Sequence, residues 1–274
     1  MKKIKVSDPL YPKNLTQNEK EALTDELYKI QTQIFDGVDR NTFYKYVIAP
    51  ETYLTKIYLF KNRRNETVGF LTFHLYRVEV EKKGKRKKVC VVRTETGILE
   101  AYRGKAPIFS IVFRESLKCY LKLGFPEGYF VATPIHPVPF LIAQRSCKEI
   151  FPHPTQPTPP HIGQVLGQIA QSFGMERDAN SGKFVVNVGW IVKQNEAKRQ
   201  KIAESEDPLI RYYLAQNPGY AKGNGLLVIS PGSLRNLIGS SWRLMMKRLR
   251  KRRHSSRRMA SGKYTRTIFP SSIS

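Results

Sequence analysis

The sequence predicts an α/β fold in which a mixed, mostly antiparallel central sheet is flanked by helices. Three segments rich in β-branched and aromatic residues, at 53–60, 67–80 and 89–96, are separated by short polar turns, as in antiparallel hairpins. The third segment leads through a basic turn at 102–107 into a helical pattern at 108–123. Apolar residues make up 41% of the 274 residues and include 14 Phe and 14 Tyr, which is enough for a substantial core.

Two helices are expected ahead of these strands. Thr16 has the side chain of an N-cap, and Glu19, three residues later, completes a capping-box pattern. Apolar residues then recur at helical spacing until Gly37. Asp39 is expected to begin a second, short helix, which Pro50 ends.

The centre of the chain is a strand, turn, helix and strand in sequence. The helix at 108–123 carries apolar residues on several faces, so we expect it to be largely buried, and Gly124 is expected to stop it. A short apolar strand at 129–133 follows, and another helix is expected to open near Pro137.

Residues 151–160 contain five prolines, so this segment is expected to be a stiff connector rather than a helix or central strand. The patterns beyond it predict a helix at 161–173, a strand at 184–192, helices from 195 and from 208, and a strand at 226–230. A basic amphipathic segment at 233–253 predicts one more helix, and 255–274 has the composition of a disordered tail. We therefore expect one domain at 1–239, with the connector inside it, and a basic C-terminal helix and tail at 240–274.

The net charge of +25 is concentrated in two places. From Ser241 onward there are 11 Lys/Arg and no Asp/Glu, and residues 82–88 hold six more positive charges. Such a distribution attracts polyanions, which include nucleic acid, anionic lipid and acidic proteins such as an acyl carrier protein. The charge alone does not choose among these partners.

Several classes of protein are disfavoured. No run approaches the roughly 20 apolar residues of a membrane span, and the charged start has no apolar stretch behind it, so no signal peptide is expected. The three cysteines lack motif spacing, which favours a reducing, cytoplasmic setting and argues against a zinc site or disulfide framework. His153 and His161 have no matching Cys or Asp cluster, so no metal is expected.

The turn between the strand at 89–96 and the helix at 108–123 suits an anion. A strand that ends in a glycine-containing turn and feeds directly into a helix leaves the first backbone N–H groups of that helix without intrahelical partners. These groups carry the positive end of the helix dipole, and Arg103 and Lys105 add full charges. The turn therefore predicts a site for a phosphate or pyrophosphate.

This arrangement resembles the acyl-CoA-binding core of the GNAT N-acyltransferase superfamily, over about 18–151 at the level of element order. The pyrophosphate loop of that superfamily follows Arg/Gln-x-x-Gly-x-Gly/Ala. Arg103 matches its first position, Gly104 and Lys105 fit an Arg-Gly-Lys variant, and Ala106 and Ile108 stand where glycines are usual. The resemblance implies that these five residues, with the backbone amides that follow, hold the pyrophosphate of acyl-CoA or acetyl-CoA.

The resemblance also implies transfer of an acyl group to an amine. An acidic acyl carrier protein, as in the autoinducer-synthase relatives of the fold, is a close alternative donor. The base of the family is often a Glu on the strand before the loop, which is Glu95 here; the competing interpretation is a solvated charge on an alternating strand. Aligning on Ala143 puts Cys147 at the position of the usual Tyr acid, so Tyr129 and His136 are the substitute acids. The competing interpretation of His136, between prolines, is a turn residue.

A rival hypothesis from another class is a non-catalytic nucleic-acid-binding protein on the same fold. Its support is the two Lys/Arg clusters together with 14 Tyr that can stack on bases. A third hypothesis is a protein held on an anionic membrane surface by the basic segment at 242–258, with its Trp and Met side chains.

Overall fold

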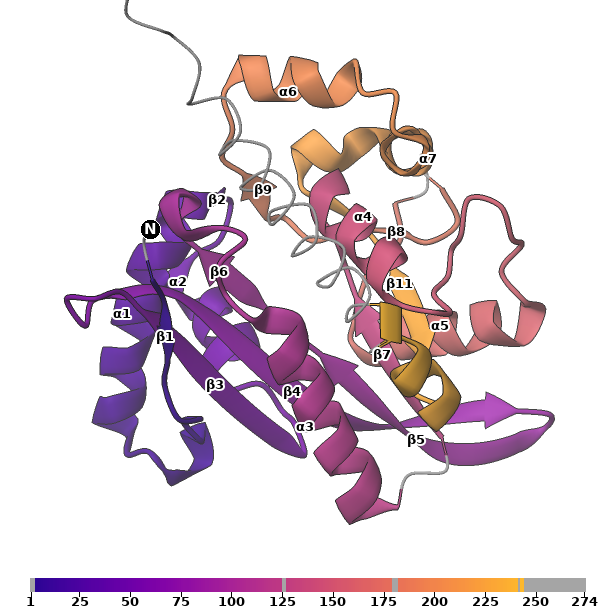
Figure 1. The fold of residues 1–274 in the computed structure, drawn as a ribbon. Coiled ribbons are helices and arrows are strands. Elements are labelled where there is room, and N and C mark those ends of the chain that lie inside the picture. The colour runs from indigo at the N-terminus through magenta and orange to yellow at the C-terminus, as the bar shows by residue number, and fades with distance from the viewer. Residues whose placement is uncertain (1–2, 125–126, 179–181, 241, 244–274) are drawn as a thin grey trace, which may run out of the picture.

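The computed structural model describes residues 3–124, 127–178, 182–240, 242 and 243. Within them, seven strands form one sheet in the order β1-β3-β4-β5-β7-β11, with β6 paired to β4 (Figure 1). These strands are β1 (Lys5–Val6), β3 (Leu54–Lys61), β4 (Thr67–Lys82), β5 (Lys85–Arg93), β6 (Thr96–Ile98), β7 (Gly128–Ala132) and β11 (Val228–Pro231). All neighbours are antiparallel except β5 and β7, which are parallel. The predicted mixed, mostly antiparallel sheet flanked by helices is confirmed.

The two predicted hairpins form, but the third predicted strand is divided. Strands β3, β4 and β5 are consecutive and antiparallel, and the second turn uses positive φ angles at Lys83 (52°) and Gly84 (71°). The prediction of one strand over 89–96 was wrong, because β5 ends at Arg93 and β6 begins at Thr96. Between them, the Glu95 N–H donates to the Thr72 hydroxyl (3.0 Å) rather than to a carbonyl of β4, so the regular ladder is interrupted.

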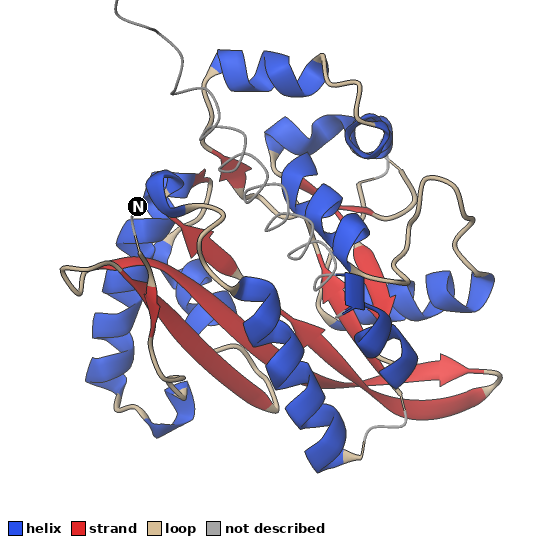
Figure 2. Cartoon of the chain, in the orientation of Figure 1, coloured by secondary structure: helices blue, strands red, loops and turns tan. Residues whose placement is uncertain are grey.

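The helices lie on both sides of this sheet (Figure 2). They are α1 (Gln17–Ile34), α2 (Arg40–Phe43), α3 (Ile108–Leu123), α4 (Pro137–Ser146), α5 (Pro160–Ser172), α6 (Glu196–Ala203) and α7 (Pro208–Gln216), with a π turn at Tyr44–Ile48 and 3-10 turns at Pro12–Asn14, Glu100–Tyr102 and Pro218–Lys222. The capping box predicted at Thr16 and Glu19 is present, and the Asp39 side chain caps α2. The bounds predicted for the helix after the basic turn are those of α3, but the prediction that it is largely buried was wrong, because only one side packs on the sheet and Leu121 is 71% exposed.

Successive side chains of β4 bury into opposite layers. Phe70 packs with α1, and Val78 and Val80 pack with α5, so α1 and α5 cover one face. Leu71 and Leu75, with the opposite orientation, pack with side chains of α3, which lies across the other face (Figure 1). The layers are therefore helix, sheet and helix, and the sheet supplies a core on both faces.

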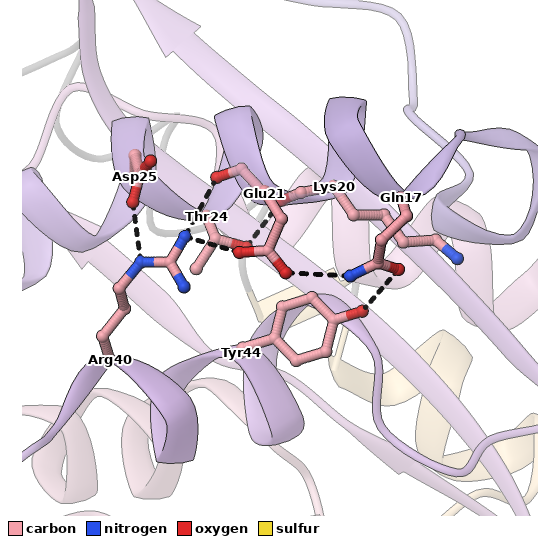
Figure 3. A network of polar contacts seen from close by, with 7 residues as sticks. All are labelled: Gln17, Lys20, Glu21, Thr24, Asp25, Arg40 and Tyr44. Carbon is pink, nitrogen blue, oxygen red and sulfur yellow. Dashed lines mark hydrogen bonds and ion pairs between the residues drawn. The ribbon is translucent and has the colours of Figure 1, made fainter.

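The first two helices are joined at their surface by a polar network (Figure 3). The Arg40 guanidinium donates to Glu21 Oε2 (2.6 Å) and to Asp25 Oδ1 (2.7 Å). Gln17 donates to Glu21 (2.8 Å) and accepts from the Tyr44 hydroxyl (3.4 Å). Because the side chains of Arg40, Glu21 and Asp25 are 41–56% exposed, these ion pairs join α2 to α1 but contribute little stability.

The predicted strand at 184–192 was also wrong as a single element. It is divided into β8 (Val185–Asn187), which pairs with β10 (Asn224–Leu226), and β9 (Ile191–Val192), which pairs with β2 (Phe35–Asp36). Gly189, between the two pieces, has a φ of 75° and turns the chain, as only glycine does at low cost.

Part of the predicted C-terminal helix is described. Residues 234–240, 242 and 243 are helical. Residue 241 and residues 244–274, which hold most of the predicted basic helix and all of the predicted tail, lie outside the described residues. Within the part of the chain that the structure describes, no helix is long and apolar enough to cross a membrane.

Candidate active site

The centre of the candidate site is an opening between the two parallel strands. Strands β5 and β7 are in register over three pairs only, and the last of these joins Val92 to Phe130. Beyond that point β7 continues beside β11, whereas the chain after β5 stays beside β4, with which β6 pairs as β5 does. The segment 94–95 and the end of β7 therefore lie on opposite sides of an opening in the sheet.

Glu95 lies on one side of this opening and is held by its backbone. The Thr72 N–H donates to the Glu95 carbonyl (2.8 Å), and the Glu95 N–H donates to the Thr72 hydroxyl. The carboxylate is 28% exposed and lies 3.5 Å from the Arg93 guanidinium. Burial raises the pKa of this carboxyl above its ordinary value, and the charge of Arg93 only partly opposes that rise. A carboxylate with a raised pKa binds a proton more readily, and the partial burial of Glu95 distinguishes it from a fully solvated surface charge.

Around Glu95 lies a group of side chains that the sequence analysis missed. His74 is opposite Arg93 in the β4–β5 ladder, 1% exposed, with Nδ1 3.0 Å from the Thr55 hydroxyl. Burial and the nearby Arg93 lower the pKa of His74 to about 3, so the ring is neutral. Tyr76 shares this face, and its ring lies 4.7 Å from that of Phe173, over which Arg93 also lies (5.0 Å). His74 and Tyr76 are two residues apart on β4, so they lie on the same face of the sheet. They lie near Glu95 because His74 is opposite Arg93, whose guanidinium lies beside the Glu95 carboxylate.

The basic turn before α3 is exposed, as an anion site requires. Arg103, Gly104 and Lys105 are exposed, and a side chain built on Gly104, whose φ is 75°, would meet nothing within 4 Å. Lys105 Nζ donates to the Ala101 carbonyl (2.8 Å). Ala106 and Ile108 are half-buried and pack with the core under α3, so they contribute backbone to the turn rather than side chains. The side chain of Ile108 is thereby directed to the core.

His136 lies where β7 gives way to α4, near the basic turn. Its Nδ1 accepts from the Val138 N–H (3.2 Å), which caps α4, and its Nε2 lies 3.2 Å from Gln194 Oε1. Because Nδ1 accepts, the proton is on Nε2 and is directed to the glutamine oxygen. Burial lowers the pKa of His136, the hydrogen bond to Gln194 opposes this, and the positive charge of Arg103 lowers it further. His136 and the basic turn are therefore close, and the geometry is that of the competing interpretation, a residue that organises a turn.

Tyr129 is not brought together with Glu95 and His136. It is opposite Val91, before the opening, and only 4% exposed, with its ring among the side chains under α5. Its hydroxyl donates to Glu127 Oε1 (2.6 Å). Burial and this carboxylate raise the pKa of Tyr129, so the hydroxyl keeps its proton.

The basic cluster at 82–88 forms the tip of the β4–β5 hairpin. Lys82 pairs with Glu127, and Lys88 lies 3.7 Å from Glu79. Four further cations of this tip, Lys83, Lys85, Arg86 and Lys87, are exposed, and for them no ion pair is seen among the described residues. Among the same residues, no group of three or more His, Cys, Asp or Glu side chains could hold a metal ion.

Neither a protein-family model nor a curated protein matches the chain. Solved structures do match. A conserved protein from Enterococcus faecalis V583 is 13% identical over 54% of this chain and only 33% of its own length, with a TM-score of 0.33. Arabidopsis thaliana NAA60 in complex with a bisubstrate analogue is 11% identical over 84% of this chain and 99% of its own, with a TM-score of 0.37. A GNAT-family acetyltransferase from Staphylococcus aureus Mu50 is 13% identical over 56% of this chain and 89% of its own length, with a TM-score of 0.34. The fold class follows from the strand order of this chain itself.

Proposed function

We propose that this protein is an N-acyltransferase that moves an acyl group from a CoA thioester to an amine. The observation that carries the proposal is the opening between β5 and β7, with Glu95 on its edge. An opening between two parallel strands lets a thioester and an amine meet from opposite faces of one sheet. Strand peptide groups released from the ladder can also donate to the carbonyl oxygen as negative charge develops on it.

The donor would be held at the N-terminus of α3. The first turn of this 16-residue helix presents backbone N–H groups and the positive end of the helix dipole. Arg103 and Lys105 are exposed in the turn just before it and add two full charges. Gly104 leaves open space there, so a pyrophosphate can approach the backbone closely.

Glu95 would accept the proton of the attacking amine. The amine nitrogen forms a bond to the thioester carbonyl carbon, the C–S bond breaks, and the nitrogen proton passes to the carboxylate. The leaving thiolate takes a proton from solvent and Glu95 returns its proton to solvent, since the Tyr129 hydroxyl is engaged with Glu127 and the Nε2–H of His136 with Gln194. Of the three candidate residues, only Glu95 keeps a proposed chemical role.

The test is transfer from acetyl-CoA and longer acyl-CoAs to n-alkylamines and to the N-termini of short peptides, followed by release of the CoA thiol. Glu95→Gln is expected to lower kcat by a factor of roughly 10² to 10⁴ while the variant still binds CoA. The same change at the exposed Glu51 is the control. Equal rates for wild type and Glu95→Gln would remove the base from the proposal.

An acidic partner is a second candidate, favoured by the exposed cations at the tip of the β4–β5 hairpin. Such a tip suits an acyl carrier protein as an alternative donor or, for a non-catalytic protein, a nucleic acid. Binding to single-stranded DNA that weakens steeply between 50 and 200 mM salt, in a protein that does not bind CoA, would favour the second role. The hypothesis of a membrane-surface anchor at 242–258 concerns a segment that lies almost wholly outside the described residues.

A further inference from the structure

A cavity of about 130 Å³ lies on the α3 face of the sheet, between α3 and the helical residues 234–240. Its floor is formed by β5, β7 and β11, and its wall by α3. The side chains that make it apolar include Val92, Phe109, Val112, Phe113, Phe130 and Leu237. In a chain with a net charge of +25, no charged residue is among the described residues that line it.

All three cysteines of the sequence line this one cavity. Burial raises the pKa of Cys90 to about 11 and also raises the pKa of Cys119 and Cys147, so the three thiols are neutral. A neutral thiol in such a place behaves as a small apolar side chain. The chemistry of the cavity therefore suits an uncharged, aliphatic ligand.

The position of the cavity connects it to the opening. Val92 and Phe130 both line it, and they are the last pair of the β5–β7 ladder before the strands part. Phe109, in the first turn of α3, lines it as well, so the cavity begins beside the proposed pyrophosphate site. A thioester carbonyl in the opening would thus have an apolar space behind it on the α3 side, while Glu95 serves the other side.

We propose that this cavity binds the aliphatic tail of the acyl donor, so that the donor carries a chain longer than acetyl. This inference rests on the proposed function. An engineered apolar cavity of about 150 Å³ holds one benzene molecule, so a space of this size accommodates roughly six carbon atoms. The preferred donor is therefore a medium-chain acyl thioester, and an acetyl group would leave most of the cavity unfilled.

The size of the effect follows from the transfer of methylene groups. Each methylene that leaves water for an apolar site increases affinity about fourfold. Hexanoyl-CoA, with four more carbons than acetyl-CoA, is then expected to bind about two orders of magnitude more tightly. The gain is expected to level off once the chain exceeds the cavity, which sets the series apart from general adsorption to an apolar surface.

The experiment is a calorimetric series of free CoA and of acetyl-, butyryl-, hexanoyl-, octanoyl- and dodecanoyl-CoA with the full chain. Ser116, on α3, lines the cavity, and Ser116→Leu is expected to fill it and flatten the series. The matched control is Ser172→Leu at the exposed end of α5, which should leave the series unchanged. In the wild type, octanoate at saturation should slow labelling of the half-buried Cys147 by methyl methanethiosulfonate, a measurement that needs no variant to fold.

The outcomes separate this inference from the proposed function. Two results together would overturn the cavity as an acyl site: equal affinities for acetyl-CoA and all longer acyl-CoAs, and labelling of Cys147 that is as fast with octanoate as without it. They would not contradict the proposed CoA-dependent transferase. If octanoate binds and protects Cys147 but the protein neither binds CoA nor acylates amines, the cavity would be supported as an acyl site and the proposed transferase would be contradicted. A steep series that Ser116→Leu flattens and Ser172→Leu does not would support both.

Discussion

Replacing Glu115 by Gln tests how α3, which carries the basic turn and roofs the cavity, is fixed to the sheet. The Glu115 side chain is fully buried, and its carboxylate lies 2.7 Å from Lys56 Nζ, 3.0 Å from Arg114 Nε and 3.1 Å from Lys118 Nζ. Burial alone would raise the pKa of this carboxyl, but the three cations together lower it to about 2. Lys56 comes from β3, so the ion pair ties the helix to the sheet.

The lowered pKa sets the expected magnitude. A drop of roughly two units from the ordinary Glu value corresponds to about 3 kcal/mol of folding free energy at pH 7. Glu115→Gln is expected to lose about this amount, because it also leaves the Lys56 ammonium, 12% exposed, without its carboxylate. The measurement is urea unfolding of wild type, Glu115→Gln and the control Glu26→Gln, an exposed glutamate on α1.

The pH dependence gives an independent check. A carboxyl whose pKa is lowered in the folded state stabilises fully above the pKa of the unfolded chain and loses that contribution as the pH falls. Between pH 5 and pH 3 the wild type should therefore lose about 1.5 kcal/mol more than Glu115→Gln does. A loss below 1 kcal/mol at pH 7, together with parallel pH profiles for the two proteins, would refute the argument that this ion pair holds α3.

Three further predictions concern residues elsewhere in the fold. His74 stays neutral in the folded state with a pKa of about 3, but it is protonated in the unfolded chain as the pH falls. The free energy of unfolding of the wild type should therefore drop by about 2 kcal/mol between pH 7 and pH 5, and urea titrations of His74→Gln should not show this drop. An NMR titration of His74 near pH 6.5 would contradict this. Gly37→Ala should destabilise the protein by more than about 1 kcal/mol in thermal unfolding, because φ is +82° and the new Cβ would lie 2.1 Å from the Gly189 carbonyl oxygen. The control Gly167→Ala, in open space on α5, should stabilise slightly. Equal effects of the two substitutions would argue against backbone strain at Gly37. Tyr213→Phe removes a buried hydroxyl that donates to the Pro134 carbonyl (2.9 Å) and accepts from the Asn217 amide (3.1 Å). Chemical unfolding should show that the free energy of unfolding falls by about 1–3 kcal/mol. An unchanged free energy would mean that water replaces the hydroxyl.

Local chemistry made much of the fold predictable. The capping box at Thr16 and the stop at Gly124 each depend on residues close together in the chain, and α3 has the predicted bounds. The interruption at Glu95 depends instead on the Thr72 hydroxyl, 23 residues away, which takes the N–H that a continuous strand would have given to β4. No local pattern carries that information.

The candidate site was predictable only in part, for the same reason. Glu95 follows a strand and Arg103 lies in a turn, and the order of strand, turn and helix is visible in the sequence. His74 lies near the site because the antiparallel register sets it opposite Arg93. Tyr129 does not lie at the opening because the parallel register sets it opposite Val91, before the strands part. A shift of one residue in either register would reverse the faces, so the members of the site are decided by pairing rather than by residue type.

The most direct test of the proposed function is thermal unfolding of the full chain with and without CoA, for wild type, Arg103→Ala and Arg86→Ala. Arg86 is exposed on the β4–β5 hairpin, so its replacement removes the same charge away from α3 and controls for general attraction between a basic protein and an anion. A ligand that binds only the folded state raises the unfolding temperature by mass action. We expect CoA to raise the midpoint of wild type and of Arg86→Ala, and the rise to disappear in Arg103→Ala. No shift in any of the three proteins, or an equal shift in all of them, would contradict a CoA site at the start of α3.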